Sequence, residues 1–245
     1  MRPADIESLE RATVEAVAPA SVIEMDGWLI AFDPGTIRRA HSAVPLRHDL
    51  DASALDAIEA AYRTAGLTPA FRLPLSAGLE GVRDVLVRRG YTNEQPTVVE
   101  ISDVVRLAAF RDLPGEILAH PDDAWGEVFL GPGFDPVDGA ERVAVLTRSP
   151  DALYGQVREG GRTVAVGVVT FGHGWAGIHG MRTASAHQGR GHASQILAAL
   201  GRAACERGVE RVSLQVEEAN PARRIYRRAG FEPVWTYCYW TKGTV

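Results

Sequence analysis

The sequence predicts an α/β protein made of two mixed α/β units in tandem. Segments with the periods of helices and strands alternate along all 245 residues, which favours mixed sheets flanked by helices. The hexapeptides LVRRGY (86–91) and YRRAGF (226–231) each end a predicted helix directly before a predicted strand. A strand and, before it, another helix precede each hexapeptide, so we interpret the pair as a weak internal repeat.

The first half is expected to contain three helices and four strands. Apolar residues at roughly helical spacing, with Gly66 and Gly90 as C-caps, predict the helices, and short apolar runs between turn residues predict the strands. The helices are expected over 4–17, 54–66 and 78–91, and the strands over 27–32, 36–44, 70–73 and 96–101. The turn signal DPG (33–35) suggests that the first two of these strands form a hairpin.

The second half repeats a similar order after a joining segment, 102–125, that carries the breakers LPGE and HPDD. Asn220 as N-cap and Pro221 at the first helical position mark the start of the last helix, and the glycine pair at 160–161 marks a tight turn. Helices are expected over 139–149, 189–208 and 220–230, and strands over 152–159, 162–171, 175–183, 209–217 and 231–241.

Composition and charge exclude several classes of protein. The net charge of −5 argues against a broad, positively charged surface that binds nucleic acid, although arginines gather on the last helix. Cys205 and Cys238 stand in no metal-binding spacing and cannot form a disulfide framework. We see neither a signal peptide nor a membrane span, so a cytoplasmic protein without a metal or a membrane partner is expected.

The segment HQGRGHAS (187–194) lies where a helix begins. A helix N-terminus offers free backbone N–H groups and a partial positive charge, which together bind phosphate, and small residues let the backbone approach closely. A P-loop needs a lysine that is absent here, and a dinucleotide-binding loop needs glycine where Ser194 stands. The third option is Q-x-x-G-x-A, which runs from Gln188 through Gly191 to Ala193.

This loop and a second motif, NPARRIYRRAGF (220–231), make residues 126–245 resemble the GNAT superfamily of acyl-CoA-dependent N-acyltransferases. The family has a loop of the form R/Q-x-x-G-x-G/A after its fourth strand. An asparagine, a tyrosine and a Gly-Phe pair follow about 30 residues later, as they do here. The resemblance implies tandem units, each a mixed, mostly antiparallel twisted sheet flanked by helices. We expect a degenerate unit at 1–105, a linker at 106–125 and a catalytic unit at 126–245.

The resemblance also implies roles for individual residues. The coenzyme A pyrophosphate would lie on the loop, and the pantetheine arm would pair with the end of the fourth strand. Tyr226 would be the general acid, while Glu217, His179 or water would serve as base; Asn220 would contact coenzyme A or only cap its helix. The residues expected to bind acetyl-CoA are Met181, Arg182, Thr183, Gln188, Gly189, Arg190, Gly191, His192, Ala193 and Asn220.

The first half lacks both the glycine loop and the tyrosine of the second half. PLRHDLDASALD (45–56) contains no glycine loop, and Leu86 stands where the second half has Tyr226. By the resemblance we expect this half to be structural, to shape the substrate cleft, or both.

The resulting hypothesis is an N-acetyltransferase. It would move an acetyl group from acetyl-CoA to a primary amine of a small molecule or peptide by direct attack in a ternary complex. A non-catalytic acyl-CoA-binding sensor or scaffold is the alternative. The aromatic final strand is expected to pack against the first half or against a partner, so a homodimer is one option.

Overall fold

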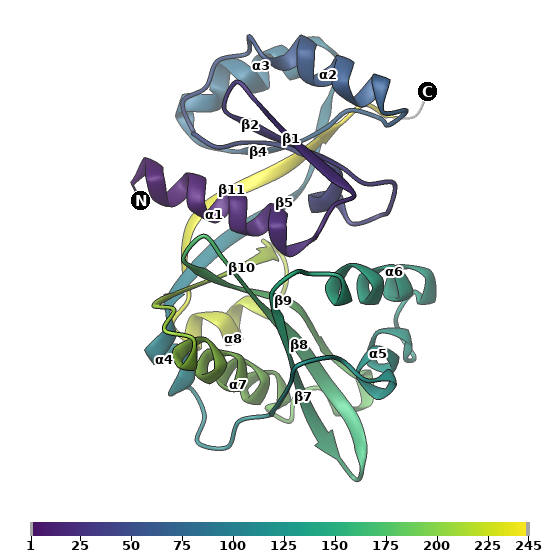
Figure 1. Ribbon diagram of the computed structural model, residues 1–245, viewed down its shortest axis with the longest axis vertical. Coiled ribbons are helices and arrows are strands. Elements are labelled where there is room, and N and C mark those ends of the chain that lie inside the picture. The colour runs from purple at the N-terminus through teal and green to yellow at the C-terminus, as the bar shows by residue number, and fades with distance from the viewer. Residues whose placement is uncertain (1, 244–245) are drawn as a thin grey trace.

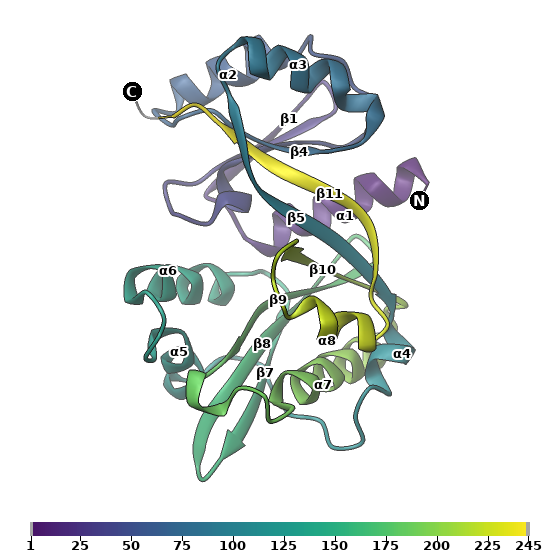
Figure 2. The same ribbon diagram turned by 180° about the vertical axis from the view of Figure 1, so that it is seen from behind.

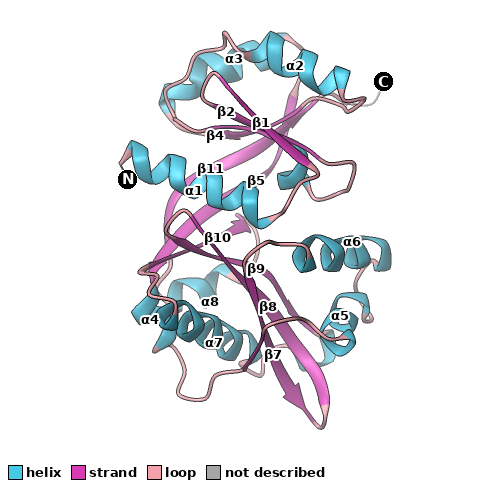
Figure 3. Cartoon of the chain, viewed as in Figure 1, coloured by secondary structure: helices cyan, strands magenta, loops and turns pink. Residues whose placement is uncertain are grey.

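The computed structural model describes residues 2–243 and contains a mixed sheet that runs through both halves (Figures 1 and 3). The first half provides, in chain order, α1 (Pro3–Ala16), β1 (Ser21–Met25), β2 (Trp28–Phe32), the 3₁₀ turn η1 (Arg38–His41), β3 (Ala43–Pro45), α2 (Leu55–Thr64), β4 (Ala70–Pro74), the 3₁₀ turn η2 (Ala77–Leu79), α3 (Glu80–Arg88) and β5 (Thr92–Asp103).

The second half provides more helices and longer strands. Its elements are α4 (Val104–Ala108), β6 (Glu116–Leu118), α5 (Asp123–Leu130), α6 (Pro136–Thr147), β7 (Ala152–Glu159), β8 (Arg162–Gly172), β9 (Trp175–Thr183), the 3₁₀ turn η3 (Ser185–His187), α7 (His192–Glu206), β10 (Arg211–Glu217), α8 (Arg223–Arg228) and β11 (Glu232–Thr241). None of the described helices has the length and apolar character needed to span a membrane.

The two halves exchange their last strands. Within the described residues the strand order is β1-β2-β3-β4-β11-β5-β10-β9-β8-β7-β6. β11, the last strand of the chain, therefore lies between β4 and β5 of the first half, and β5 pairs with β10 of the second (Figure 2). Tyr237, Tyr239 and Trp240 of β11 are buried, so the aromatic final strand packs against the first half.

The two hexapeptides of the internal repeat lead into this exchanged pair of strands. The N–H of Tyr91 donates to the carbonyl of Leu86 at 3.0 Å, and the N–H of Phe231 donates to the carbonyl of Tyr226 at 3.0 Å. A left-handed glycine precedes each strand, with φ of +82° at Gly90 and +94° at Gly230. Leu86 and Tyr226 therefore occupy matching positions, and Leu86 is a fully buried core residue.

The predicted hairpin is correct in its strand pairing, because β2 and β3 pair antiparallel, but wrong in its tight turn. The tight turn lies one strand earlier, at Asp26 and Gly27, whose φ values are +48° and +79°, and it joins β1 to β2. β1 is an exposed edge strand, so its sequence lacks the apolar alternation that identifies a half-buried strand. The Asp33 carboxylate instead accepts a hydrogen bond from the N–H of Gly35 at 2.9 Å, and this local turn leads into η1.

The segment between the halves is ordered. Asp103 caps α4 by accepting hydrogen bonds from the N–H groups of Val105 and Arg106, and β6 pairs with β7 at the edge of the sheet. The division of the chain at 106–125 stays a prediction, because the exchange of β5 and β11 gives both halves one sheet.

Helices cover the two faces of the second half differently. α7 and α8 pack on one face, on a core that includes Ile196, Leu200 and Tyr226. α5 packs on the other face through Trp125 and Phe129. The end of α1 meets α6 on this second face (Figure 1), so the sheet separates the α7–α8 layer from the α1–α5–α6 layer.

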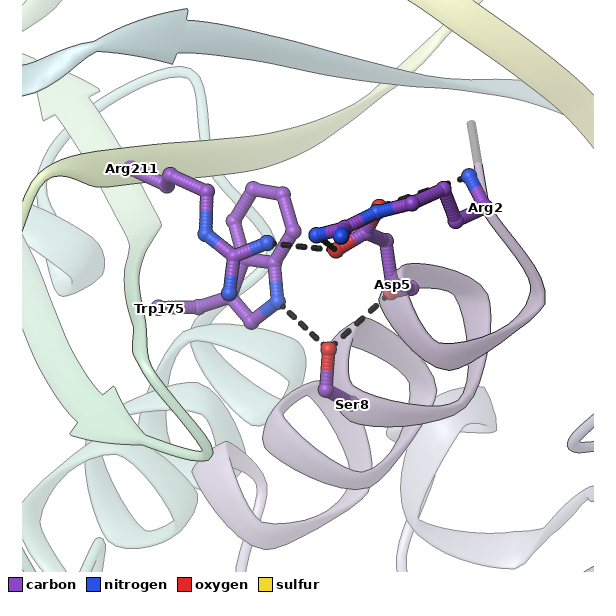
Figure 4. A network of polar contacts seen from close by, with 5 residues as sticks. All are labelled: Arg2, Asp5, Ser8, Trp175 and Arg211. Atoms are coloured by element: carbon purple, nitrogen blue, oxygen red, sulfur yellow. Dashed lines mark hydrogen bonds and ion pairs between the residues drawn. The ribbon is translucent and has the colours of Figure 1, made fainter.

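The N-terminal helix α1 is tied to the second half by a polar network (Figure 4). Arg211 of β10 donates to the Asp5 carboxylate at 2.7 Å, and its guanidinium lies 4.2 Å from the ring centre of Trp175. The indole N–H of Trp175 donates to the Ser8 hydroxyl at 3.0 Å, and Arg2 also pairs with Asp5 at 3.0 Å. The start of α1 is therefore fixed to β9 and β10.

A buried ion pair ties α1 to strand β4 within the first half. Arg72 of β4 lies 2.6 Å from the Glu10 carboxylate, and both side chains are 1% exposed. The Arg72 guanidinium also faces the ring of Tyr237 at 5.1 Å, which belongs to the exchanged strand. A charge this deep is stable only with its partner, because its desolvation is otherwise uncompensated.

We expect Glu10→Gln to lower the free energy of unfolding by about 3–5 kcal/mol, because it leaves a buried guanidinium without a counter-charge. Guanidinium chloride denaturation measures the loss. Glu7→Gln is the matched control, since it breaks an exposed pair with Arg11 on the same helix and should cost less than about 1 kcal/mol. The double variant Glu10→Leu/Arg72→Met should be more stable than Glu10→Gln. A Glu10→Gln variant as stable as the wild type would contradict this account.

Candidate active site

The parallel strands β9 and β10 separate halfway along their length. They pair only over residues 175–178 and 211–214, although β9 continues to Thr183 and β10 to Glu217. A register shift between β8 and β9 and a φ of +57° at Gly180 mark a bulge at this point. The backbone of β9 after Ile178 therefore has no strand paired with it on the β10 side.

A cavity of about 460 Å³ lies at this separation. Its walls come from both halves of the chain. The first half contributes η1 and β5, and the second half contributes α5, α6, β9, β10, α8 and β11. Six of the residues proposed from sequence line it, namely His179, Met181, Arg182, Glu217, Asn220 and Tyr226. Thr183 and the loop 188–193 are not among the lining residues, so the loop lies outside the cavity.

Tyr226 reaches the cavity from α8, on the opposite face of the sheet from α6. It is 8% exposed and packs edge-on against Phe231, with ring centres 6.1 Å apart. Burial, and then the nearby Glu100 carboxylate, raise the pKa of Tyr226 to about 12, because both disfavour a phenolate. The hydroxyl therefore keeps its proton at neutral pH.

His179 lies on β9 and is a neutral side chain. One ring nitrogen, Nε2, lies 3.1 Å from the Thr170 hydroxyl, and Nδ1 has no hydrogen-bond partner within residues 2–243. Burial, and then the positive charge of Arg39, lower the pKa of His179 to about 3. The imidazole thus stays uncharged over the physiological range.

Glu217 ends β10 and is held by the first half. Its carboxylate accepts a hydrogen bond from the side-chain amide of Gln95 at 2.6 Å, and Gln95 has a left-handed φ of +55° within β5. Asn220 follows in the next turn, where its side-chain oxygen accepts from the N–H of Ala222 at 2.9 Å. Asn220 therefore caps this turn, and a contact with coenzyme A stays a prediction.

The loop before α7 presents free backbone donors. Gly189 and Gly191 have φ values of +77° and +87°, and Gly191 caps α7 without any side-chain oxygen. The N–H groups of residues 189–193 have no acceptor in the described part of the chain. The helices α4, α5 and α6 differ, because Asp103, Asp122 and Asp135 cap them. Such a free N-terminus can bind an anion.

The side chains of the loop itself are already engaged. Arg190 donates to the Glu159 carboxylate at 2.9 Å, and Nε2 of His192 lies 3.1 Å from the same carboxylate. The side-chain amide of Gln188 donates to the carbonyl of Thr183 at 3.4 Å. Arg111 lies outside the loop, and its guanidinium is 3.2 Å from the position that a Cβ would take at Gly191. An anion on the loop would therefore meet the backbone N–H groups and the guanidinium of Arg111.

The matching turn of the first half, just before α2, lacks the glycine loop and carries a carboxylate. Asp51 accepts a hydrogen bond from the N–H of Ser53 at 2.9 Å, and its negative charge opposes the binding of an anion at this turn. Leu86, where the second half has Tyr226, is buried.

The sequence did not indicate the cavity residues of the first half and of β11. Arg38 and Arg39 stand in a segment that was expected to be a strand, and only their position on η1 brings them to the cavity. Tyr237 and Tyr239 line it because β11 is exchanged, which no local pattern reveals. Among residues 2–243, no group of three or more His, Cys, Asp and Glu side chains could hold a metal ion.

We expect the buried His179 to make the protein less stable in acid. The unfolded chain binds a proton near pH 6.5, whereas the folded chain binds it only near pH 3. The stabilising contribution is thus complete above about pH 6.5 and falls by up to about 1.4 kcal/mol per pH unit as the pH drops toward 3.

In urea denaturation, the loss of stability between about pH 7.5 and 5 should be about 2 kcal/mol smaller for His179→Gln than for the wild type. His48, whose pKa burial also lowers to about 4, contributes equally to both proteins and cancels in the comparison. Ring resonances of His179 that titrate near pH 6.5 would overturn the assignment.

Known proteins are similar to this chain in sequence and in fold. The family model described as the C-terminal part of the probable histone acetyltransferase Rv0428c matches residues 3–240. The uncharacterized N-acetyltransferase YobR of Bacillus subtilis (strain 168) is 24% identical over 242 residues, which are 96% of this chain and 98% of YobR.

Two solved structures share the fold over nearly the whole chain. The GCN5-related N-acetyltransferase from Kribbella flavida has a TM-score of 0.72 at 18% identity, covering 98% of this chain and 96% of its own. A tandem GNAT protein from the clavulanic acid biosynthesis pathway has a TM-score of 0.61 at 13% identity, covering 98% and 95%. The chain belongs to the Rv0428c C-terminal family of the GNAT superfamily and is a GNAT-type acyltransferase.

Proposed function

We propose that this protein transfers an acetyl group from acetyl-CoA to the primary amine of a small molecule. The amine nitrogen attacks the thioester carbonyl within a ternary complex, the carbon–sulfur bond breaks, and the sulfur leaves as a thiolate that takes up a proton. The observation that carries this proposal is the cavity at the separation of β9 and β10, which Tyr226 enters from the opposite face.

The residues present fit acetyl-CoA. The free N–H groups at 189–193 suit its pyrophosphate, with Gln188, Arg190 and His192 beside it. The unpaired backbone of β9 at Met181, Arg182 and Thr183 offers alternating donors and acceptors, so the amides of the pantetheine arm can add to it like another strand.

The two substrates would then approach from opposite faces of the sheet. The loop 188–193 leads into α7, which packs on the same face as α8, whereas η1, α5 and α6 line the cavity. Acetyl-CoA would therefore enter from the α7 side and the amine from the cavity. Their reacting atoms would meet where β9 and β10 part, next to Tyr226.

Tyr226 is assigned as the general acid. Its raised pKa, about 12, keeps the phenol protonated at every physiological pH. The same shift makes it a weaker acid than free tyrosine, so the assignment rests on its position in the cavity rather than on its acidity. A phenol is also uncharged, which suits a side chain that is 8% exposed.

Glu217 is assigned to remove the proton of the amine. Its carboxylate lines the cavity and lies on an exposed residue, from which a proton can pass to solvent. His179 also lines the cavity, but its pKa of about 3 makes the imidazole a weak proton acceptor. His179 stays the second candidate on grounds of position.

A small acceptor suits the cavity better than a long peptide. The cavity volume of about 460 Å³ falls within the range of about 300–1,000 Å³ that is usual for small-molecule sites. The family description calls Rv0428c a probable histone acetyltransferase; for this chain a free amine metabolite is the simpler proposal.

Tyr226→Phe should lower kcat about 10²- to 10⁴-fold, the usual contribution of a general acid, while the Kd of acetyl-CoA stays unchanged. Thiol release with a panel of primary amines measures the rate, and calorimetry measures binding. Tyr62→Phe is the matched control, because it removes another buried hydroxyl, bonded to the carbonyl of Ala31, far from the cavity.

In the same assay, Glu217→Gln should lower kcat/KM, because it removes the carboxylate that lines the cavity. His179→Gln should change kcat/KM less than about twofold, because the lowered pKa of His179 makes it a weak base. The opposite order would move the base to His179. A wild type that binds acetyl-CoA but acetylates no amine would overturn the proposed function.

Gly191→Ala should raise the Kd of acetyl-CoA by about tenfold or more, because a side chain at φ +87° strains the turn and blocks the close approach of a phosphate. Gly208→Ala is the matched control. It imposes similar strain at φ +70° with nothing within 4 Å of the new Cβ, and it should leave the Kd unchanged. Equal Kd values for both variants would remove the loop from the binding site.

A further inference from the structure

The cavity is lined by more positive than negative charge. Four arginines face it, namely Arg38, Arg39, Arg142 and Arg182, against one carboxylate among its described lining residues, Glu217. The chain as a whole is acidic, with a net charge of −5, so this excess of arginine is local to the cavity.

Two of the four arginines carry a charge that the protein does not neutralise. Arg38 pairs with Glu94 at 2.5 Å, and Arg142 pairs with Asp138 at 2.6 Å. Arg39 and Arg182 have no ion-pair partner anywhere in residues 2–243. Because half-buried charges without partners are costly, these two guanidinium groups mark a place for an external anion.

Arg182 is held in position by aromatic rings. Its guanidinium lies 4.1 Å from the ring centre of Phe134 and 5.5 Å from that of Phe129. Burial, and then the charge of Arg142, lower the pKa of Arg182, and Asp138 opposes them only in part. Cation–π contacts with the two rings hold the guanidinium in place without using its N–H groups as ion-pair donors.

Arg39 brings positive charge to the same cavity from the first half. It stands on η1, and its charge acts on the pKa values of His179 and Tyr237, two other lining residues on β9 and β11. The orphaned Nδ1 of His179 also faces no partner of the protein. Arg39 and Arg182 therefore approach one cavity from the two halves of the chain.

We propose that the acceptor is a small primary amine with an anionic group, a carboxylate or a phosphate, which Arg39 and Arg182 bind. This inference rests on the proposed function and names its substrate class. The planar guanidinium forms paired hydrogen bonds with either anion, and the Glu217 carboxylate attracts the ammonium end of the same molecule. The cavity thus suits a zwitterion.

The same charges select against cationic acceptors. A polyamine or a lysine-rich peptide would bring positive charge next to Arg39 and Arg182, where like charges repel in a partly desolvated site. Specificity would therefore come from repulsion of the wrong amine as well as from attraction of the right one.

Matched pairs of amines test the charge of the acceptor. γ-Aminobutyrate is compared with n-butylamine and with putrescine, which tests recognition of a carboxylate. O-Phosphoethanolamine is compared with ethanolamine, which tests recognition of a phosphate. The wild type should acetylate the anionic member of at least one set with a kcat/KM about tenfold or more above its neutral partner, and putrescine least well.

Variants then connect this preference to the two arginines. Arg39→Met and Arg182→Met should each lower kcat/KM for the preferred anionic amine about ten- to a hundredfold, the usual effect of losing a charged hydrogen bond. The ratio of kcat/KM for the anionic amine to that for n-butylamine should fall by a similar factor, because n-butylamine has no anionic group for a guanidinium to bind, and Arg182→Lys should restore part of this ratio. Arg63→Met, which removes an exposed charge from α2, should change nothing.

The outcomes are distinct. Equal rates with anionic and neutral amines, a lysine-rich peptide as the best acceptor, or an equal loss with every amine in the Met variants would overturn the anionic acceptor and leave the acetyltransferase intact. Binding is measured separately, by calorimetry with the anionic amines in the presence of coenzyme A. Anionic amines that bind no better than their neutral partners would overturn the inference even if no amine were acetylated.

Discussion

The hydrogen bonds between β5 and β11 are the constraint on which the rest of the structure depends. Each strand begins in one half of the chain and completes the sheet of the other. Without β11, the backbone edge of β4 would have no strand paired with it. Without β5, the same would hold for the edge of β10. The halves are therefore joined by continuous backbone pairing in addition to side-chain contacts, and the cavity lies where they meet.

Helix α1 reinforces this joint with charges. The buried pair of Glu10 and Arg72 connects it to β4, and Asp5 connects it to Arg211 of β10. One helix thus holds both halves on the face of the sheet that carries the cavity. The desolvation of Arg72 makes this arrangement specific, since only the native register brings the carboxylate to it.

The two matching helix–glycine–strand units perform different tasks. In the second half the helix carries Tyr226 to the cavity, whereas in the first half it carries the core residue Leu86. The first half instead contributes Arg39 on η1 and Gln95, which holds Glu217. A unit without the glycine loop and the tyrosine can therefore still shape the site, because the exchanged strands place it against the other half.

Local sequence determined most of the elements and both motifs, whereas β1, α4, β6 and α5 were not predicted. The loop 188–193 and the helix with Tyr226 were predictable because glycine positions, caps and periodic apolar residues act within a few neighbours along the chain. The edge strand β1 escaped prediction since it is exposed and has no apolar face. Only the tertiary structure decided the exchange of β5 and β11 and the meeting of Arg39, Arg182 and Glu217 in one cavity. Strand order depends on pairing between distant segments, and such pairing leaves no pattern in either segment alone.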